Sequence, residues 1–279
     1  MNSSGILSII TFVYVLAGFC YIFAWIFKKP SAGKAATWVA LIGLAGNLIG
    51  IVMRWVESYQ MGFGHAPLSN LYESLVFFAG TIVLICLVIE RKYSNRVIGA
   101  FVVPLAFLAM AYASLSPNIS DRIQPLIPAL KSNWLIANVI ACFIGYGAFA
   151  VAFGVSFMYL VKRKNAGDTG SMMGHLPDAG VLDELNHQLV MFGFLFLSVG
   201  IITGAVWANS AWGRYLGWDP KETWSLITWF VYATLLHARL MRGWRGKRTA
   251  ILSIGGFAAV MFTYFGVNLL PGLHSYGSF

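Results

Sequence analysis

The sequence predicts an all-α polytopic membrane protein, a bundle of about eight transmembrane helices with an outward-facing, tryptophan-rich segment. Hydrophobic residues make up 58% of the chain and charged residues only 10%, a balance that soluble globular domains do not have. Apolar runs near the ~20 residues that a bilayer requires recur from one end of the chain to the other. No soluble segment interrupts them, so we expect residues 1–279 to form a single transmembrane domain.

The first apolar run, residues 6–27, is too long for a signal-peptide core and no cleavage site follows it, so we expect a retained helix. Seven further spans are expected at 36–54, 70–90, 97–115, 133–161, 188–207, 224–242 and 250–270. The stretch 165–185 is expected to be a mobile loop. The patterns Gly46-x-x-x-Gly50 and Gly200-x-x-x-Gly204 predict close approach of helices.

The basic residues predict the orientation of the chain. Of the 19 Lys and Arg residues, 14 lie in alternate loops, and the other five are Arg54, Arg122, Lys131, Arg214 and Lys221. The positive-inside rule places the richer side in the cytoplasm or stroma, so both termini and residues 207–224 are expected outside. The +9 net charge then reflects topology and contact with anionic lipid, and not nucleic-acid binding. We expect a multi-pass protein of a bacterial cytoplasmic membrane or a thylakoid membrane.

Residues 207–224 form a short polar break that carries Trp207, Trp212, Trp218, Trp224 and Tyr215. A tryptophan at the membrane interface is ordinary, because its ring sits at the acyl boundary while its N–H stays hydrated. Four in so short a stretch are more than anchoring requires. The segment therefore predicts a flat aromatic platform that holds a large planar ligand at the membrane surface.

Two interpretations apply to the charged residues of this segment. Asp219, Pro220 and Glu222 have the order of a helix start with a capping box, which is a purely structural role. Alternatively the segment also binds an anion, in which case Arg214 and Lys221 pair with ligand carboxylates such as propionates. The sequence leaves both open.

Three histidines are candidates for chemistry. His274 lies in the C-terminal tail, expected beside the platform because both are outside, and a neutral imidazole is a good haem-iron ligand. His237 lies 13 residues past Trp224, about 20 Å deeper in the membrane. A titratable residue there is usually functional, with an inter-helix hydrogen bond as the competing account. His65 lies in an outer loop, where a histidine is more often solvated. The three cysteines show no C-x-x-C spacing, so the chain carries no covalently attached c-type haem of its own.

The chain resembles the tryptophan-rich "WWD" proteins of cytochrome c assembly, in the CcsA/ResC branch of the system II machinery. The resemblance rests on the stretches 204–209, 218–224 (WDPKETW), 227–229 and 236–239. It is supported by 54–55, 67–74, 132–135 and 273–277. It runs from about residue 50 to the C-terminus, and its motifs are highly specific.

The resemblance implies a function. Such proteins, with a CcsB/ResB-type partner, carry haem b across the membrane and present it outside, where it is joined to the C-x-x-C-H thiols of apocytochrome c. The chain would then be the haem-presenting part of a holocytochrome c synthase. Two outer histidines ligate haem over the WWD segment in this family, and a membrane histidine forms an inner site. His274 matches the second outer histidine and His237 the membrane one.

The sequence departs from the family at two positions. Asn138 stands where the first outer histidine is expected, and an amide oxygen is a poor iron ligand beside imidazole. Leu216 stands where a tryptophan is usual. A membrane haem-binding or haem-export protein without ligation activity is therefore the alternative function. A general transporter for a small solute is a third, but no ionisable cluster near the bilayer midplane supports it.

Overall fold

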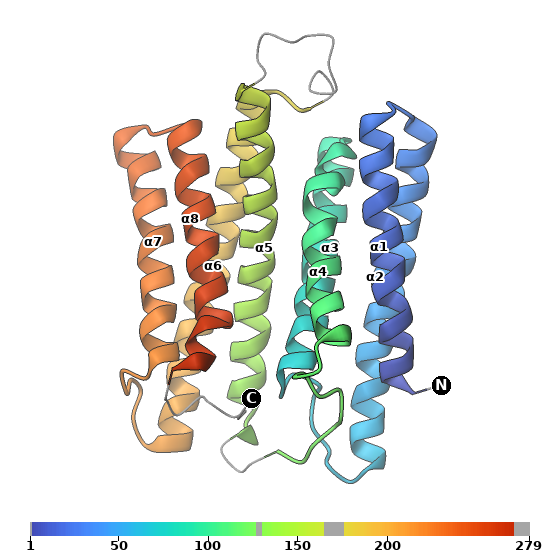
Figure 1. The fold of residues 1–279 in the computed structure, drawn as a ribbon. Coiled ribbons are helices and arrows are strands. Elements are labelled where there is room, and N and C mark those ends of the chain that lie inside the picture. The colour runs from blue at the N-terminus through green and yellow to red at the C-terminus, as the bar shows by residue number, and fades with distance from the viewer. Residues whose placement is uncertain (1, 127–129, 165–175, 271–279) are drawn as a thin grey trace. The chain divides into compact units, whose positions relative to one another are not determined.

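The protein is described by a computed structural model at residues 2–126, 130–164 and 176–270. Long helices dominate this part of the chain, and no strand occurs in it (Figure 1). They are α1 (Ser3–Ile26), α2 (Pro30–Gln60), α3 (Leu71–Tyr93), α4 (Val97–Leu115), α5 (Asn133–Lys164), α6 (Ala179–Trp212), α7 (Pro220–Arg242) and α8 (Lys247–Tyr264), followed by the 3-10 helix η3 (Gly266–Leu269).

Each predicted span coincides with one of these eight helices, so the predicted fold class is confirmed. Six of them, α1 to α6, are long and apolar enough to cross a membrane. That α7 and α8 also cross it stays a prediction. Several bounds were wrong. α2 extends six residues beyond the expected span at each end, and α8 ends at Tyr264, six residues short of the expected end. α6 runs from Ala179 to Trp212, so 179–185 is helix and not loop, while residues 165–175 of the expected loop lie outside the described residues.

The contacts divide the chain into two compact units. Unit 1 comprises Met1–Ile127 and Val161–Asp178, and therefore contains α1 to α4. Unit 2 comprises Pro128–Leu160 and Ala179–Phe279, and contains most of α5 together with α6, α7 and α8. The single-domain organisation expected from the sequence stays a prediction. The candidate residues are divided between the units: His65 belongs to unit 1, and Asn138, His237 and the tryptophan-rich segment belong to unit 2.

Unit 1 is held by close helix contact and by buried polar pairs. A Cβ atom added at Gly46 would lie 2.3 Å from Ile10 Cδ1, and one at Gly50 would lie 2.6 Å from Leu7 Cδ2. These glycines therefore let α2 approach α1, as the Gly46-x-x-x-Gly50 pattern predicts. Deep in the same unit, the carboxylate of Glu90 accepts a hydrogen bond from Tyr21. Such pairing is required because an unpaired buried carboxylate is very costly.

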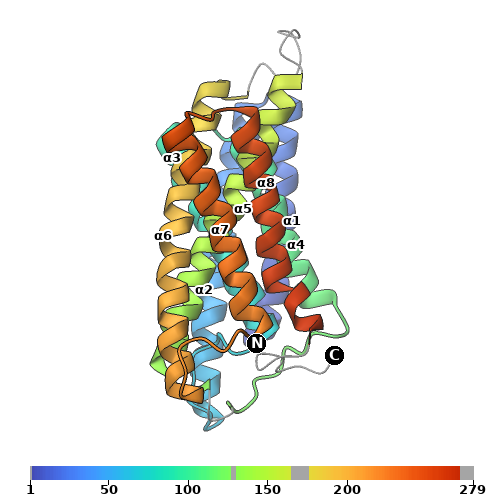
Figure 2. The ribbon, with the colours of Figure 1, turned by 90° about the vertical axis from the view of Figure 1, so that its left-hand side faces the viewer.

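Unit 2 packs α7 beside α8, and both views show them as neighbours (Figures 1 and 2). Its core contains the stacked rings of Phe149 and Tyr232, with centroids 3.6 Å apart. The hydroxyl groups of Thr228 on α7 and Thr263 on α8 lie 2.8 Å apart. These contacts fix α7, which starts at the tryptophan-rich segment.

The early start of α6 has a polar cause. Asp183 in its second turn accepts a hydrogen bond from Arg239 of α7 at 2.8 Å. The same carboxylate accepts bonds from the Gly246 N–H at 2.7 Å and from the Thr249 hydroxyl at 3.0 Å. Glu184 forms a second ion pair with Arg239 at 3.1 Å. These bonds to α7 and α8 therefore stabilise 179–185 as helix, although its polar residues suggest a loop in the sequence alone.

The predicted orientation gives the first test. The 14-to-5 split of basic residues predicts that the C-terminus lies outside the cytoplasm. Alkaline phosphatase fused after Phe279 is expected to be active, whereas the same enzyme fused after Ser94, in the predicted inner loop between α3 and α4, is expected to be inactive. The opposite pattern would invert the topology, and with it the outward placement of residues 207–224.

Candidate functional site

The tryptophan-rich segment is a rigid turn between α6 and α7. α6 ends at Trp212, and Gly213 follows at φ +73°, where a residue without a Cβ is favoured. Asp219 is the N-cap of α7, and its side chain accepts the Lys221 N–H at 3.2 Å. Glu222 closes a capping box and also accepts the Gly217 N–H at 2.7 Å. The structural role of these acids is therefore confirmed.

Trp218 is held in a conformation that its side chain disfavours. Its φ is +56°, in the left-handed region, where a non-glycine residue costs about 1–3 kcal/mol. The residue is 69% exposed, so packing against the described residues offsets little of that cost. The neighbouring Tyr215 is 62% exposed as well. Strained, exposed side chains of this kind cluster at functional sites, so Trp218 stays a candidate ligand contact.

The other tryptophans do not continue this exposed surface. Trp207 is buried and meets Trp212 edge-on, with ring centroids 4.9 Å apart and planes at 63°. Trp224 packs against Phe262 of α8, with centroids 4.1 Å apart. The expected flat platform of four tryptophans is thus divided: Trp207, Trp212 and Trp224 support the segment by packing, while Trp218 presents its face.

The two cations of the segment differ in their surroundings. Arg214 is exposed, and its guanidinium lies over Gly217, where an added Cβ would come within 2.8 Å of Nε. Lys221, in the first turn of α7, is half-buried, and its backbone N–H donates to the Asp219 carboxylate at 3.2 Å. Both remain candidates for pairing with ligand carboxylates, Arg214 from the open side and Lys221 from the α5 side.

Asn138 lies on α5 where that helix meets α6. Its Nδ2 donates to the Gly200 carbonyl oxygen at 2.7 Å and lies 3.7 Å from Cys142 Sγ. A Cβ at Gly204 would lie 2.6 Å from the same Nδ2, and one at Gly200 would lie 2.4 Å from the Cys142 sulfur. The Gly200-x-x-x-Gly204 pattern therefore provides the predicted close approach, and its purpose is to accommodate Asn138 and Cys142.

The Gly200 carbonyl oxygen is a group that the sequence did not point to. Residue 138 uses it as a hydrogen-bond acceptor, in the manner in which a ligating histidine usually donates its Nδ1–H to a backbone carbonyl. Only the three-dimensional register of α5 against α6 brings the two together.

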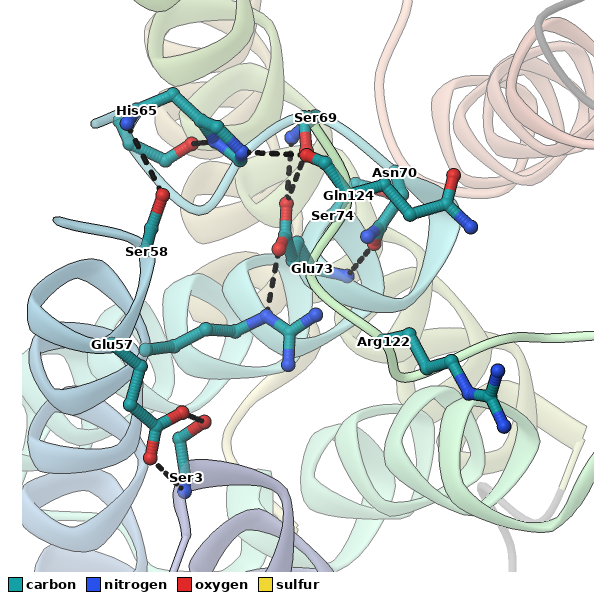
Figure 3. A network of polar contacts seen from close by, with 12 residues as sticks. Ser3, Glu57, Ser58, His65, Ser69, Asn70, Glu73, Ser74, Arg122 and Gln124 are labelled. Atoms are coloured by element: carbon teal, nitrogen blue, oxygen red, sulfur yellow. Dashed lines mark hydrogen bonds and ion pairs between the residues drawn. The ribbon is translucent and has the colours of Figure 1, made fainter. Parts of the chain in front are cut away.

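His65 is engaged at both ring nitrogens. Its Nδ1 lies 3.0 Å from the Ala66 oxygen and its Nε2 lies 2.9 Å from the Gln124 oxygen, and the side chain is buried (Figure 3). The expectation of a solvated loop histidine is therefore wrong. Ligation of a metal by His65 requires that one of these contacts be broken.

His237 projects from the exposed face of α7. Phe230 and Met241 on the same helix are 61% and 73% exposed. Within the described ranges no hydrogen-bond partner is found for His237, so the competing account of a bond to a neighbouring helix lacks an acceptor there. His274 lies outside the described residues, and its role stays a prediction.

The exposure of His237 leads to a prediction. If it forms an inner haem site with a histidine of another chain, His237→Ala should lower the haem affinity of the complex at least about tenfold. Loss of a ligand's supporting hydrogen bond alone has an effect of that size. The low-spin absorbance of the purified complex measures it, and Thr234→Ala, an exposed substitution on the same helix, is the control. An unchanged spectrum in His237→Ala would refute the inner site.

Comparison with known proteins identifies the family. Residues 68–274 match the family described as Cytochrome C assembly protein. The chain is 39% identical to cytochrome c biogenesis protein CcsA of Synechococcus sp. (strain CC9311), over 91% of this chain and 92% of that protein. It is 39% identical to the CcsA of Gloeobacter violaceus, over 88% and 86% of the two chains.

A solved structure shares the fold. Cytochrome c haem lyase CcmF superposes with a TM-score of 0.68 at 15% identity, covering 96% of this chain and 50% of that one. This chain therefore spans half the length of CcmF, and the likeness concerns the fold alone. The relationship to the CcsA proteins is much closer. The chain belongs to the cytochrome c assembly protein family, and the process in which it acts is cytochrome c biogenesis.

Proposed function

We propose that this protein carries haem across the membrane and presents it at the tryptophan-rich segment for attachment to the C-x-x-C-H thiols of apocytochrome c. A CcsB/ResB-type membrane protein is the proposed partner, and haem b is the proposed substrate. The observation that carries the proposal is Trp218, a strained and exposed aromatic side chain fixed by a complete capping box. The rigid turn before α7 holds this side chain in its exposed position.

The residues of unit 2 suit a planar, doubly carboxylated, iron-bearing substrate. Trp218 and Tyr215 offer apolar faces to a macrocycle, and aromatic side chains contribute much of the binding energy where large surfaces are buried. Arg214 and Lys221 supply positive charge for propionates. His274 is the proposed iron ligand on this side. The chemistry of the iron porphyrin belongs to the substrate, and these residues orient it and exclude water.

The contacts of Asn138 favour a second candidate, a haem-binding or haem-export protein without ligation activity. Its Nδ2 is committed to the Gly200 oxygen, and an amide is a weak iron ligand. With one axial ligand weak or absent, haem would be held less tightly and the oxidation state of iron less well controlled. Both candidates require haem binding and differ in thioether formation.

Co-expression distinguishes the two functions. The chain and a CcsB-type partner are produced with an apocytochrome in a host that lacks its own assembly machinery. Covalent haem on the cytochrome, seen after denaturing electrophoresis, supports the synthase. A variant cytochrome with both thiols replaced by serine is the control for non-covalent carry-over. Haem bound to the chain with none transferred would support the carrier.

A further inference from the structure

A buried ion pair lies at the end of unit 1 that carries the segments 61–70 and 116–126. Arg54 near the end of α2 donates through Nε to Glu73 Oε1 at 2.7 Å, and the two side chains are only 3% and 1% exposed. The second oxygen of Glu73 accepts bonds from the N–H and the hydroxyl of Ser69, each at 2.8 Å (Figure 3). Donors of this chain therefore satisfy the carboxylate of Glu73 on both sides.

The guanidinium of Arg54 has N–H donors that the ion pair with Glu73 does not use. It carries five N–H groups, of which only Nε is used on Glu73. Its Nη2 is buried and has no hydrogen-bond partner among the described residues. Buried polar atoms nearly always have one, because an unpaired donor loses its water without compensation. Nη2 therefore needs an acceptor, and the described part of the chain does not supply one.

Tyr72 lacks a partner at the same place. The Cζ atom of Arg54 lies 5.1 Å from the centroid of the Tyr72 ring, so the two side chains are neighbours. The Tyr72 hydroxyl is also buried and unpartnered within the described residues, and the side chain is only 2% exposed. Two neighbouring side chains thus each carry a buried donor, a guanidinium N–H and a phenolic O–H, that has no partner among the described residues.

We propose that Arg54 and Tyr72 bind a carboxylate, namely a propionate of haem. N–H donors of a charged guanidinium and an O–H donor match the acceptor-only oxygens of a carboxylate. Glu73 neutralises the single positive charge of Arg54, so the site offers hydrogen-bond donors without net charge, which suits a monoanion better than a phosphate dianion. Haem is the carboxylate-bearing substrate of the proposed function, on which this inference rests. The end of unit 1 that holds the pair is also the one predicted to face outward.

The test compares haem with its dimethyl ester, in which both propionates are uncharged. Affinities are measured by absorbance titration of the purified full chain. Tyr72→Phe removes only the unpartnered hydroxyl, so the thermal unfolding midpoint should not fall. It should weaken haem binding about tenfold, the effect of a hydrogen bond to a charged group, and leave ester binding unchanged. Arg54→Lys should reduce the same preference, because an ammonium does not reproduce the fork of the guanidinium.

Arg122→Ala is the matched control, since Arg122 is an exposed arginine at the same end of unit 1. It should leave the preference for haem over the ester at the value of the unmodified protein. If Tyr72→Phe binds both ligands as the unmodified protein does, the Arg54–Tyr72 site is refuted while the proposed function stands. If the unmodified protein binds neither ligand, the proposed function fails and this inference fails with it.

Discussion

Asn138→His is expected to convert weakly held, mostly high-spin haem at the outer site into low-spin haem that survives purification. Asn138 Nδ2 already donates to the Gly200 oxygen at 2.7 Å, and the Nδ1–H of a histidine is placed to make the same bond. Its Nε2 would then be free to bind iron, opposite the proposed ligand His274. Because an oriented imidazole replaces an amide, we expect haem retention to rise at least about tenfold. Absorbance spectra before and after gel filtration measure this change.

Two controls separate ligation from packing. Asn138→Gln keeps an amide and should remain high-spin. Imidazole added to the unmodified protein should produce a partial low-spin shift, because it supplies the missing ligand from solution. A low-spin, bis-histidine spectrum in the unmodified protein that persists in His65→Ala would show that another residue already fills the position, and that Asn138 does not leave it open.

Trp218→Gly is expected to separate stability from haem binding. Glycine adopts φ +56° freely, so the substitution removes backbone strain of about 1–3 kcal/mol, while its greater unfolded-state entropy costs about 0.5–1 kcal/mol. The thermal unfolding midpoint should therefore stay level or rise. Haem affinity should fall about tenfold or more, since a fully buried aromatic side chain contributes about 1.5–3 kcal/mol.

Trp218→Phe is the comparison, because it keeps the strained backbone and part of the aromatic face. It should retain more haem than Trp218→Gly and be no more stable than the unmodified protein. A lower unfolding midpoint in Trp218→Gly with unchanged haem content would assign Trp218 a purely structural role. The proposed contact between its ring and haem would then be refuted.

The helices could be predicted from the sequence because apolar length is a local property. The capping box at Asp219 was equally predictable, since its residues are neighbours in the chain. The start of α6 was not, because the charges of Asp183 and Glu184 are compensated by Arg239, more than 50 residues away. The polar residues of 179–185 indicated a loop, whereas the ion pairs with Arg239 stabilise this stretch as the start of α6.

The residues of the candidate site could be named from the sequence, but their arrangement could not be predicted from it. Four tryptophans indicated a ligand surface, but only helix packing decides that Trp207 is buried while Trp218 is exposed. The commitment of Asn138 to the Gly200 oxygen depends on the register of α5 against α6. The unsatisfied donors of Arg54 and Tyr72 could not be foreseen either, since an unpaired atom is recognised only once its neighbours are placed.

The haem content of the purified chain, prepared with and without a CcsB-type partner, tests the central claim most directly. We expect a Soret band that follows the chain through gel filtration and weakens in Trp218→Gly and His237→Ala. A chain that purifies with its partner, folded and free of haem under haem-replete conditions, would contradict it.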